Sequence, residues 1–192
     1  MNRLMIHISD RFDRRIRSIG VASFALFVLY PANAATFMVD HVVATPGQAG
    51  VQIGITLFSD AGDEVSSLQF DLVYGAAALT LSNVENGQAS EDADKDLNFN
   101  ALSVGRVTVV IAGFNQNVIA DGVIALPVFN VNVGVPVGTY PINLENVLLS
   151  DPSGFAVLGD VLAGSITIPS EGEGEGEGEG EGEGAGEGEG EG

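Results

Sequence analysis

Cysteine and tryptophan are absent from this chain of 192 residues, and basic residues are few. Because there is no cysteine, no disulfide can stabilise a fold, and stability has to come from burial of a hydrophobic core. Beyond residue 34 the chain has two basic residues, Lys95 and Arg106, against 24 acidic ones, a formal net charge of −22. Such a field repels nucleic acid and anionic lipid head groups, so we exclude nucleic-acid binding.

Histidine is also scarce, and this argues against catalysis. His41 is the only histidine after residue 34, and we recognise no nucleophile, base and orienting group together. The acidic residues of the middle of the chain fall in turns and in one loop, without the marked acid/base pair that a glycosidase needs. We therefore expect no catalytic residues and no enzyme activity.

The densest acidic cluster is the loop 91–98. Asp92, Asp94 and Asp96 have the spacing that opens an EF-hand calcium loop, but the sixth position is Leu97 instead of glycine and the twelfth is Ser103 instead of glutamate. Acidic clusters commonly stay hydrated, so we favour a solvated loop and no resident metal. A loop-type calcium site at the three aspartates is the alternative.

The first 34 residues have the three-part composition of a secretory signal peptide. Five arginines precede an apolar run over residues 19–30, and Ala32-Asn33-Ala34 provides a small-x-small cleavage site. The apolar run is shorter than the roughly 20 residues that a membrane span requires. We expect residues 1–34 to be removed on export, which leaves an extracellular protein without a membrane span.

At the other end, residues 171–192 are a Glu-Gly repeat interrupted once, by Ala185. Glycine raises the entropy of the unfolded backbone, and charges of one sign at every second residue repel each other. We predict a disordered tail or linker. If this tail continues to an anchor in a longer protein, the location is the cell surface.

Residues 35–170 form the one predicted domain and consist of short apolar stretches separated by Gly, Asn, Asp and Pro. Apolar and polar residues alternate in these stretches, which is typical of half-buried strands, and no segment has a sustained helical period. Between Leu144 and Val147 the alternation slips by one residue, which predicts a β-bulge at Glu145-Asn146. The predicted strands cover residues 36–43, 51–57, 65–74, 79–84, 97–102, 106–112, 122–133, 139–150 and 164–168.

This pattern predicts an all-β fold, an antiparallel β-sandwich of about nine strands. Strand phase decides which residues point inward. The predicted core residues are Ile53, Ile55, Phe70, Leu72, Val109, Ile111, Phe129 and Leu144.

Four segments carry a resemblance to a known family: residues 46–57, the strand Leu-Gln-Phe-Asp-Leu-Val-Tyr at 68–74, Gly-Val-Ile-Ala-Leu at 122–126, and Leu-Ser-Asp-Pro-Ser-Gly at 149–154. In this order and at this separation they resemble the cohesin domain. The resemblance implies a jelly-roll sandwich that binds a calcium-loaded dockerin module on one flat sheet face. Any calcium would then be carried by the dockerin.

By this resemblance the docking face draws on outward residues of two strands and on the loop Phe114–Asn117. Outward sheet positions usually tolerate polar substitution, so we expect changes at Gln69 and Asp71 to leave the fold intact. The implied partner-binding residues are Ser67, Gln69, Asp71, Val73, Thr108, Val110, Asn115 and Asn117.

Two functions follow as expectations. The first is a secreted, non-catalytic module that docks dockerin-bearing proteins such as polysaccharide-degrading enzymes. The second is a carbohydrate-binding or adhesive cell-surface domain, with polysaccharide as the ligand. Sugar-binding sandwiches usually stack sugars on exposed aromatic rings, whereas the tyrosines after residue 34, Tyr74 and Tyr140, lie on core-facing strand phases. We therefore favour the first.

Overall fold

Strand β5 (Ser67–Tyr74) shows how the alternating pattern becomes structure. Phe70 and Leu72 are fully buried, whereas Ser67 and Gln69 on the opposite phase are partly exposed. Because successive side chains of a strand point to opposite faces, this burial places one side of β5 on the core. The strand pairs antiparallel with β8 (Arg106–Ala112) on one edge and with β10 (Gly138–Ser150) on the other.

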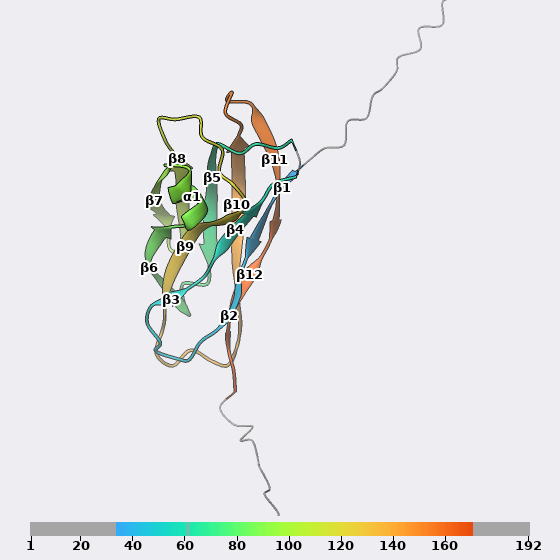
Figure 1. Cartoon of the computed structure of the whole chain (residues 1–192). Helices are drawn as coiled ribbons and strands as arrows, with labels where there is room; N and C mark the ends of the chain where they lie inside the picture. The colour runs from blue at the N-terminus through green and yellow to red at the C-terminus, as the bar shows by residue number, and fades with distance from the viewer. Residues whose placement is uncertain (1–33, 61, 171–192) are drawn as a thin grey trace, which may run out of the picture. The chain divides into compact units, whose positions relative to one another are not determined.

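The computed structural model describes residues 34–60 and 62–170 (Figure 1). The predicted signal peptide, apart from its last residue, and the predicted tail lie outside the described residues. The remaining elements are β1 (Ala34–Val39), β2 (His41–Val43), β3 (Val51–Gln52), β4 (Ile55–Phe58), β6 (Leu79–Asn86), α1 (Gln88–Asp92), β7 (Asp96–Ser103), β9 (Gly122–Val131), β11 (Ala156–Leu162) and β12 (Gly164–Ile168).

The strands form two packed layers, so the predicted β-sandwich of about nine strands is confirmed (Figure 1). Hydrogen bonds connect nine strands of the described chain in the order β3-β9-β4-β1-β11-β10-β5-β8-β7, and β2, β6 and β12 pair beside this path. Most pairs are antiparallel. Two are parallel, β1 with β11 and β2 with β12, which makes the sheet mixed.

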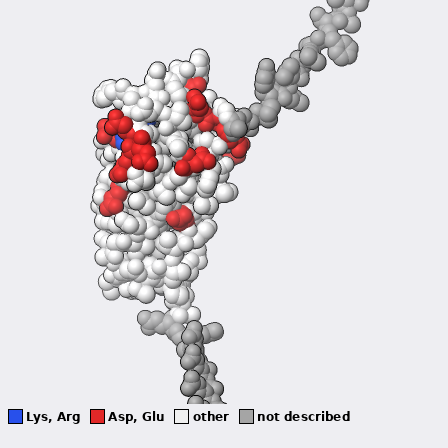
Figure 2. All heavy atoms as spheres, in the orientation of Figure 1, with Lys and Arg blue, Asp and Glu red and all other residues white. Residues whose placement is uncertain are grey.

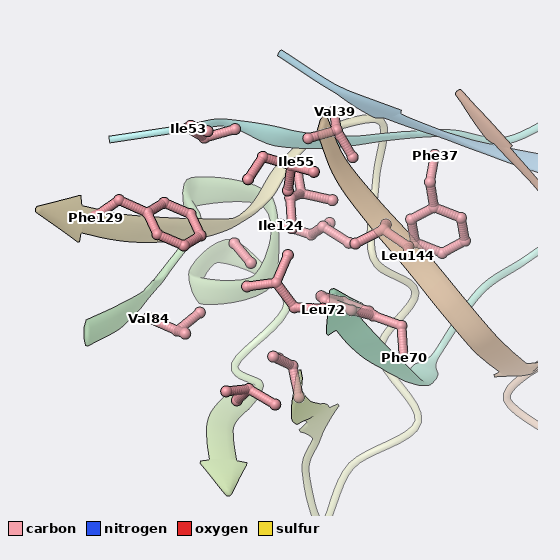
Figure 3. Packing of buried hydrophobic residues seen from close by; sticks show 14 of the residues in the cluster. Phe37, Val39, Ile53, Ile55, Phe70, Leu72, Val84, Ile124, Phe129 and Leu144 are labelled. Carbon is pink, nitrogen blue, oxygen red and sulfur yellow. The ribbon is translucent and has the colours of Figure 1, made fainter. Parts of the chain in front are cut away.

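The core lies between the two layers, and all eight predicted core residues are buried, none more than 6% exposed. Figure 3 shows side chains from both layers meeting there. Phe37 of β1 packs against Phe70 of β5 with ring centroids 6.4 Å apart. Because the chain has no disulfides, burial of these apolar side chains between the two layers is the main source of stability.

Two elements were not predicted. Strand β11 was missed because Gly159 interrupts its apolar run; a Cβ at that position would lie 2.9 Å from Leu149 Cδ1, so a larger residue there would require the Leu149 side chain to shift. Helix α1 has five residues, too few to show a helical period. Among the described residues, no helix is long and apolar enough to cross a membrane.

Candidate protein-docking face

Strands β10, β5, β8 and β7 form one continuous sheet whose outward side we call the docking face. The pairing register sets its side chains in rows across the strands. Gln69 lies opposite Val110 of β8 and Leu148 of β10, and Val110 lies opposite Asn98 of β7. Gln69 and Val110 are partly exposed and Leu148 is 63% exposed. The row is a mixed polar and apolar strip, the composition of a non-obligate protein interface.

The next row is centred on Asp71, which lies opposite Thr108 of β8 and Glu145 of β10. Val73 and Arg106 pair in the row after it. The structure thus brings together on one sheet the six strand residues that the resemblance implied: Ser67, Gln69, Asp71, Val73, Thr108 and Val110.

Asp71 differs from the expectation, because it is only 5% exposed. Its carboxylate accepts hydrogen bonds from Thr108 Oγ1 at 2.5 Å, from Asn146 Nδ2 at 2.7 Å and from an Arg106 guanidinium nitrogen at 2.8 Å. Arg106 also pairs with Glu145 on the exposed side. Asp71 is therefore not the exposed outward residue that strand phase predicted: three neighbours donate hydrogen bonds to its oxygens, so we expect its substitution to disturb the fold.

This network determines how Asp71 titrates. The hydrogen bond from Thr108, then that from Asn146, and then the nearby Arg106 hold the pKa of Asp71 below its ordinary value, against the opposing effect of burial. Hydrogen bonds to Glu145 and Asp71 raise the pKa of Arg106, so its positive charge is constant across the working pH range.

We predict that Asp71→Asn lowers the free energy of unfolding by about 1–3 kcal/mol at neutral pH, because buried donors lose a charged acceptor. A carboxyl with a lowered pKa stabilises the fold above the unfolded value of about 3.9 and loses that contribution as pH falls through the folded pKa. Urea unfolding at several pH values should show a smaller acid-induced loss of stability in the variant. Equal acid sensitivity of the two proteins would contradict this role of Asp71.

The predicted β-bulge is confirmed. The β10–β5 register shifts between Glu145 and Leu148, and Asn146 has a left-handed backbone with φ of 51°. Asparagine tolerates this conformation better than most residues. The bulge allows the Asn146 side chain to reach Asp71 and turns Leu148 outward, while Leu149 stays in the core.

Beside Leu148 the face contains a shallow hollow of about 270 Å³ between β5, β8 and β10. Ser67 and Ser150 close one side through a hydroxyl–hydroxyl hydrogen bond of 2.6 Å. Val110 and Ala112 of β8 also line it. A hollow of this size and lining can take one apolar side chain of a partner.

The loop 113–117 adjoins the end of β8, and its asparagines are used within the protein. Asn115 Oδ1 accepts a hydrogen bond from Lys95 Nζ at 2.6 Å, and its Nδ2 donates to the Asp94 carbonyl at 2.7 Å. Asn117 Nδ2 donates to the Ala93 carbonyl at 3.1 Å. The sequence suggested Asn115 and Asn117 as partner contacts; in the structure both side-chain amides fasten the loop to the α1–β7 connection.

No structural or functional role for Lys95 followed from the sequence, but the structure shows one. It is only 3% exposed, and its ammonium donates to Ser66 Oγ, the Asn115 carbonyl and Asn115 Oδ1. Burial lowers the pKa of Lys95, and the charge of Asp94 opposes that effect. A single lysine in a strongly acidic domain was the available signal, but its burial could not be read from the sequence.

Acidic side chains gather around α1 on the face seen in Figure 2. Asp92 ends α1, Asp94 has a left-handed backbone with φ of 56°, and Asp96 begins β7. Within residues 34–60 and 62–170 no group of three or more His, Cys, Asp or Glu side chains is placed to hold a metal ion. The alternative calcium site at these aspartates therefore has no support from the geometry.

His41, Tyr74 and Tyr140 each contact another residue of the protein. His41 Nδ1 lies 2.9 Å from Ser165 Oγ, Tyr140 donates to the Pro136 carbonyl at 2.7 Å, and the ring of Tyr74 packs edge-on against Phe129 with centroids 5.1 Å apart. The tyrosines therefore do not form an open stacking platform for sugars.

Comparison with known proteins gives one family. The sequence model of the cohesin domain matches residues 35–168, and among curated proteins none matches the chain.

Several solved structures share the fold. The sixth cohesin of scaffoldin B from Acetivibrio cellulolyticus, crystallised with a mutant Cel5 dockerin, is 18% identical with a TM-score of 0.64, over 70% of this chain and 99% of that one. The OlpA cohesin of Clostridium thermocellum, in complex with Doc918, is 18% identical with a TM-score of 0.64, over 71% and 99%. A non-cellulosomal cohesin from the archaeon Archaeoglobus fulgidus is 19% identical with a TM-score of 0.59, over 71% and 92%.

Proposed function

This chain belongs to the cohesin family, and from that premise we propose that its docking face binds a dockerin module carried by a separate protein. Cohesins of the same fold have been crystallised with dockerin partners. The observation that carries the proposal is the open β10–β5–β8–β7 face, where exposed Leu148 and partly exposed Val110 lie beside polar Gln69 and Thr108. A flat mixed surface of this kind suits reversible association between folded proteins.

The cohesin domain is a non-catalytic binding module, which agrees with the expectation that the chain is not an enzyme. The structure agrees with a binding surface instead of a catalytic cleft. The hollow beside Leu148 is shallow, and the carboxylate of Asp71 already accepts hydrogen bonds from Thr108, Asn146 and Arg106.

The partner that we propose is a secreted dockerin-bearing protein, such as a polysaccharide-degrading enzyme. Support for a location outside the cytoplasm comes from the three-part N-terminal sequence. By resemblance to the family, the dockerin brings its own calcium, so we expect association to depend on calcium.

The test is capture on the immobilised full chain, with secreted proteins of the source organism applied in calcium and again with a chelator. We expect calcium-dependent capture of a protein whose sequence contains a dockerin module, and we expect direct titration with that isolated module to reproduce the binding. A bound protein without a dockerin module, or binding that survives the chelator, would contradict the proposal.

The rival function is direct binding of polysaccharide. The full chain in solution should stay in the unbound fraction when it is mixed with insoluble cellulose or xylan, because the tyrosines are packed or hydrogen-bonded within the protein. Retention of the chain on either polysaccharide, without capture of a dockerin protein, would favour the carbohydrate-binding alternative.

A further inference from the structure

Phe114 is the most exposed of the large apolar residues in the described part of the chain, with a relative accessibility of 113%. It follows Gly113 at the end of β8, beside the docking face. An isolated surface apolar residue needs no explanation, but a wholly solvated phenylalanine is an unusual use of a large ring. Its ring gains nothing from the fold, so its energetic value, if any, is realised on contact with another molecule.

The loop that carries Phe114 is held firmly on both sides of the ring. After it, the Asn115 side chain accepts from Lys95 Nζ and from the Asn117 backbone N–H at 3.0 Å, and donates to the Asp94 carbonyl. Before the ring, Gly113 lies so close to the backbone at Asp94 that a Cβ on residue 113 would be 2.9 Å from the Asp94 carbonyl oxygen. A ring presented on a fixed loop loses less conformational entropy on binding than one on a loose loop.

Lys95 is the centre of this support. Its ammonium is buried and, among the described residues, makes no ion pair within 4.0 Å; its hydrogen bonds go to Ser66 and to two oxygen atoms of Asn115. Burial of an ammonium is costly unless its donors are satisfied. The arrangement therefore ties the position of the loop to the position of Lys95.

The ring is continuous with the docking face. Phe114, Gly113 and Ala112 line a second shallow hollow together with Asp96 and Asn98 of β7, and Ala112 also lines the hollow beside Leu148. One partner surface can therefore cover the Leu148 hollow, the Gln69–Val110 row and Phe114 at the same time.

The surroundings of the ring are acidic. Glu91, Asp92, Asp94 and Asp96 are all exposed on α1, on the turn after it and at the start of β7, and the neighbouring lysine is buried. Such a rim repels acidic surfaces and attracts basic ones. The partner patch that fits here is an apolar pocket bordered by lysine or arginine side chains.

We propose that Phe114 is an anchor of the docking interaction, held in place by Lys95 and inserted into an apolar, base-bordered pocket of the partner. This inference rests on the proposed function, since the pocket belongs to the protein that docks on the β10–β5–β8–β7 face. Leu148 and Val110 supply the flat part of the contact, and Phe114 supplies its protruding part. Aromatic side chains that fill a desolvated pocket are the usual hot spots of protein interfaces.

The experiment is calorimetric titration of the full chain with the captured dockerin module. Phe114→Ala should raise the dissociation constant by about 30-fold or more, as expected for a hot-spot residue. Phe114→Leu should recover part of this loss because it restores apolar volume. Val133→Ala, which truncates a residue that is 91% exposed in the loop after β9, is the matched control and should bind as the unaltered chain does.

The outcomes separate the two proposals. If the unaltered chain binds the module and Phe114→Ala binds it equally well, the docking function stands and the anchor is wrong. If the unaltered chain captures no dockerin protein, both fall together. If the unaltered chain is a dimer that Phe114→Ala dissociates, the ring serves self-association, and the anchor is again overturned.

The positioning role of Lys95 needs a readout beyond lost affinity. Lys95→Met should weaken binding, and the cost of Phe114→Ala should shrink in the Lys95→Met background, because a released loop no longer presents the ring. Circular dichroism and unfolding of each variant check that the fold persists. Additive losses of affinity in the double variant would mean that Lys95 acts on stability alone.

Discussion

Truncation of Phe70 to alanine should lower the free energy of unfolding by about 3–5 kcal/mol, the usual cost of removing a buried phenylalanine ring. Phe70 is fully buried in β5 and contacts Phe37 of the opposite layer, so its loss opens a cavity between the two sheets. Neighbours from both layers would have to move together to fill it, and close-packed interiors resist such movement. Urea unfolding monitored by circular dichroism measures the effect.

Phe155→Ala is the matched control for this experiment. Phe155 is 72% exposed in the turn before β11, so the same truncation there should change the free energy of unfolding by no more than about 0.5 kcal/mol. Similar losses in the two variants would mean that the layers are not packed as described.

Replacing Gln69 with arginine should weaken docking of the dockerin module by about 100-fold or more while the protein stays folded. Gln69 lies between Leu148 and Val110 in the central row of the docking face and is partly exposed. A long charged side chain there obstructs the flat contact whatever the partner presents. Asp71 is left unchanged, because its substitution would disturb Thr108, Asn146 and Arg106 and would confuse lost folding with lost docking.

Thr80→Arg places the same charge at an exposed position of β6, in the other layer, and should bind with unaltered affinity. A folded Gln69→Arg protein that binds as tightly as the unaltered chain would place the docking surface elsewhere. Calorimetry with the captured module, together with an unfolding curve for each variant, distinguishes these results.

Much of the fold could be predicted because alternation along a strand reports burial directly. β8 was predicted with the bounds that the structure has, and the phase slip after Leu144 located the bulge at Asn146. Alternation gives no signal where burial does not follow from side-chain type. In β11 the partly buried Val157 and Val161 pack against the core, Gly159 between them is exposed, and the outward residues Leu158 and Leu162 are apolar, so apolar and polar residues do not alternate.

The geometry of the candidate docking face could be predicted only in outline. Strand phase placed Asp71 outward, but phase says nothing about neighbours, and Arg106, Thr108 and Asn146 enclose its carboxylate. Arg106 comes from β8 and Asn146 from β10, and their meeting depends on a register that a single sequence does not specify. The buried ammonium of Lys95 was equally hidden, since lysine is among the residue types least often buried.

The two parallel pairings have a consequence for how the domain folds. β1 hydrogen-bonds β11, and β2 hydrogen-bonds β12, so the first strands of the domain acquire one of their partners only from its last strands. Contacts between such distant segments require closure of a long loop and make folding slow. A chain interrupted before Ala156 would leave β1 with an uncovered edge and β2 without its partner strand, and such surfaces pair with other chains and aggregate. We therefore expect a chain to be prone to aggregation until β11 and β12, residues 156–168, have been translated, although neither strand belongs to the docking face.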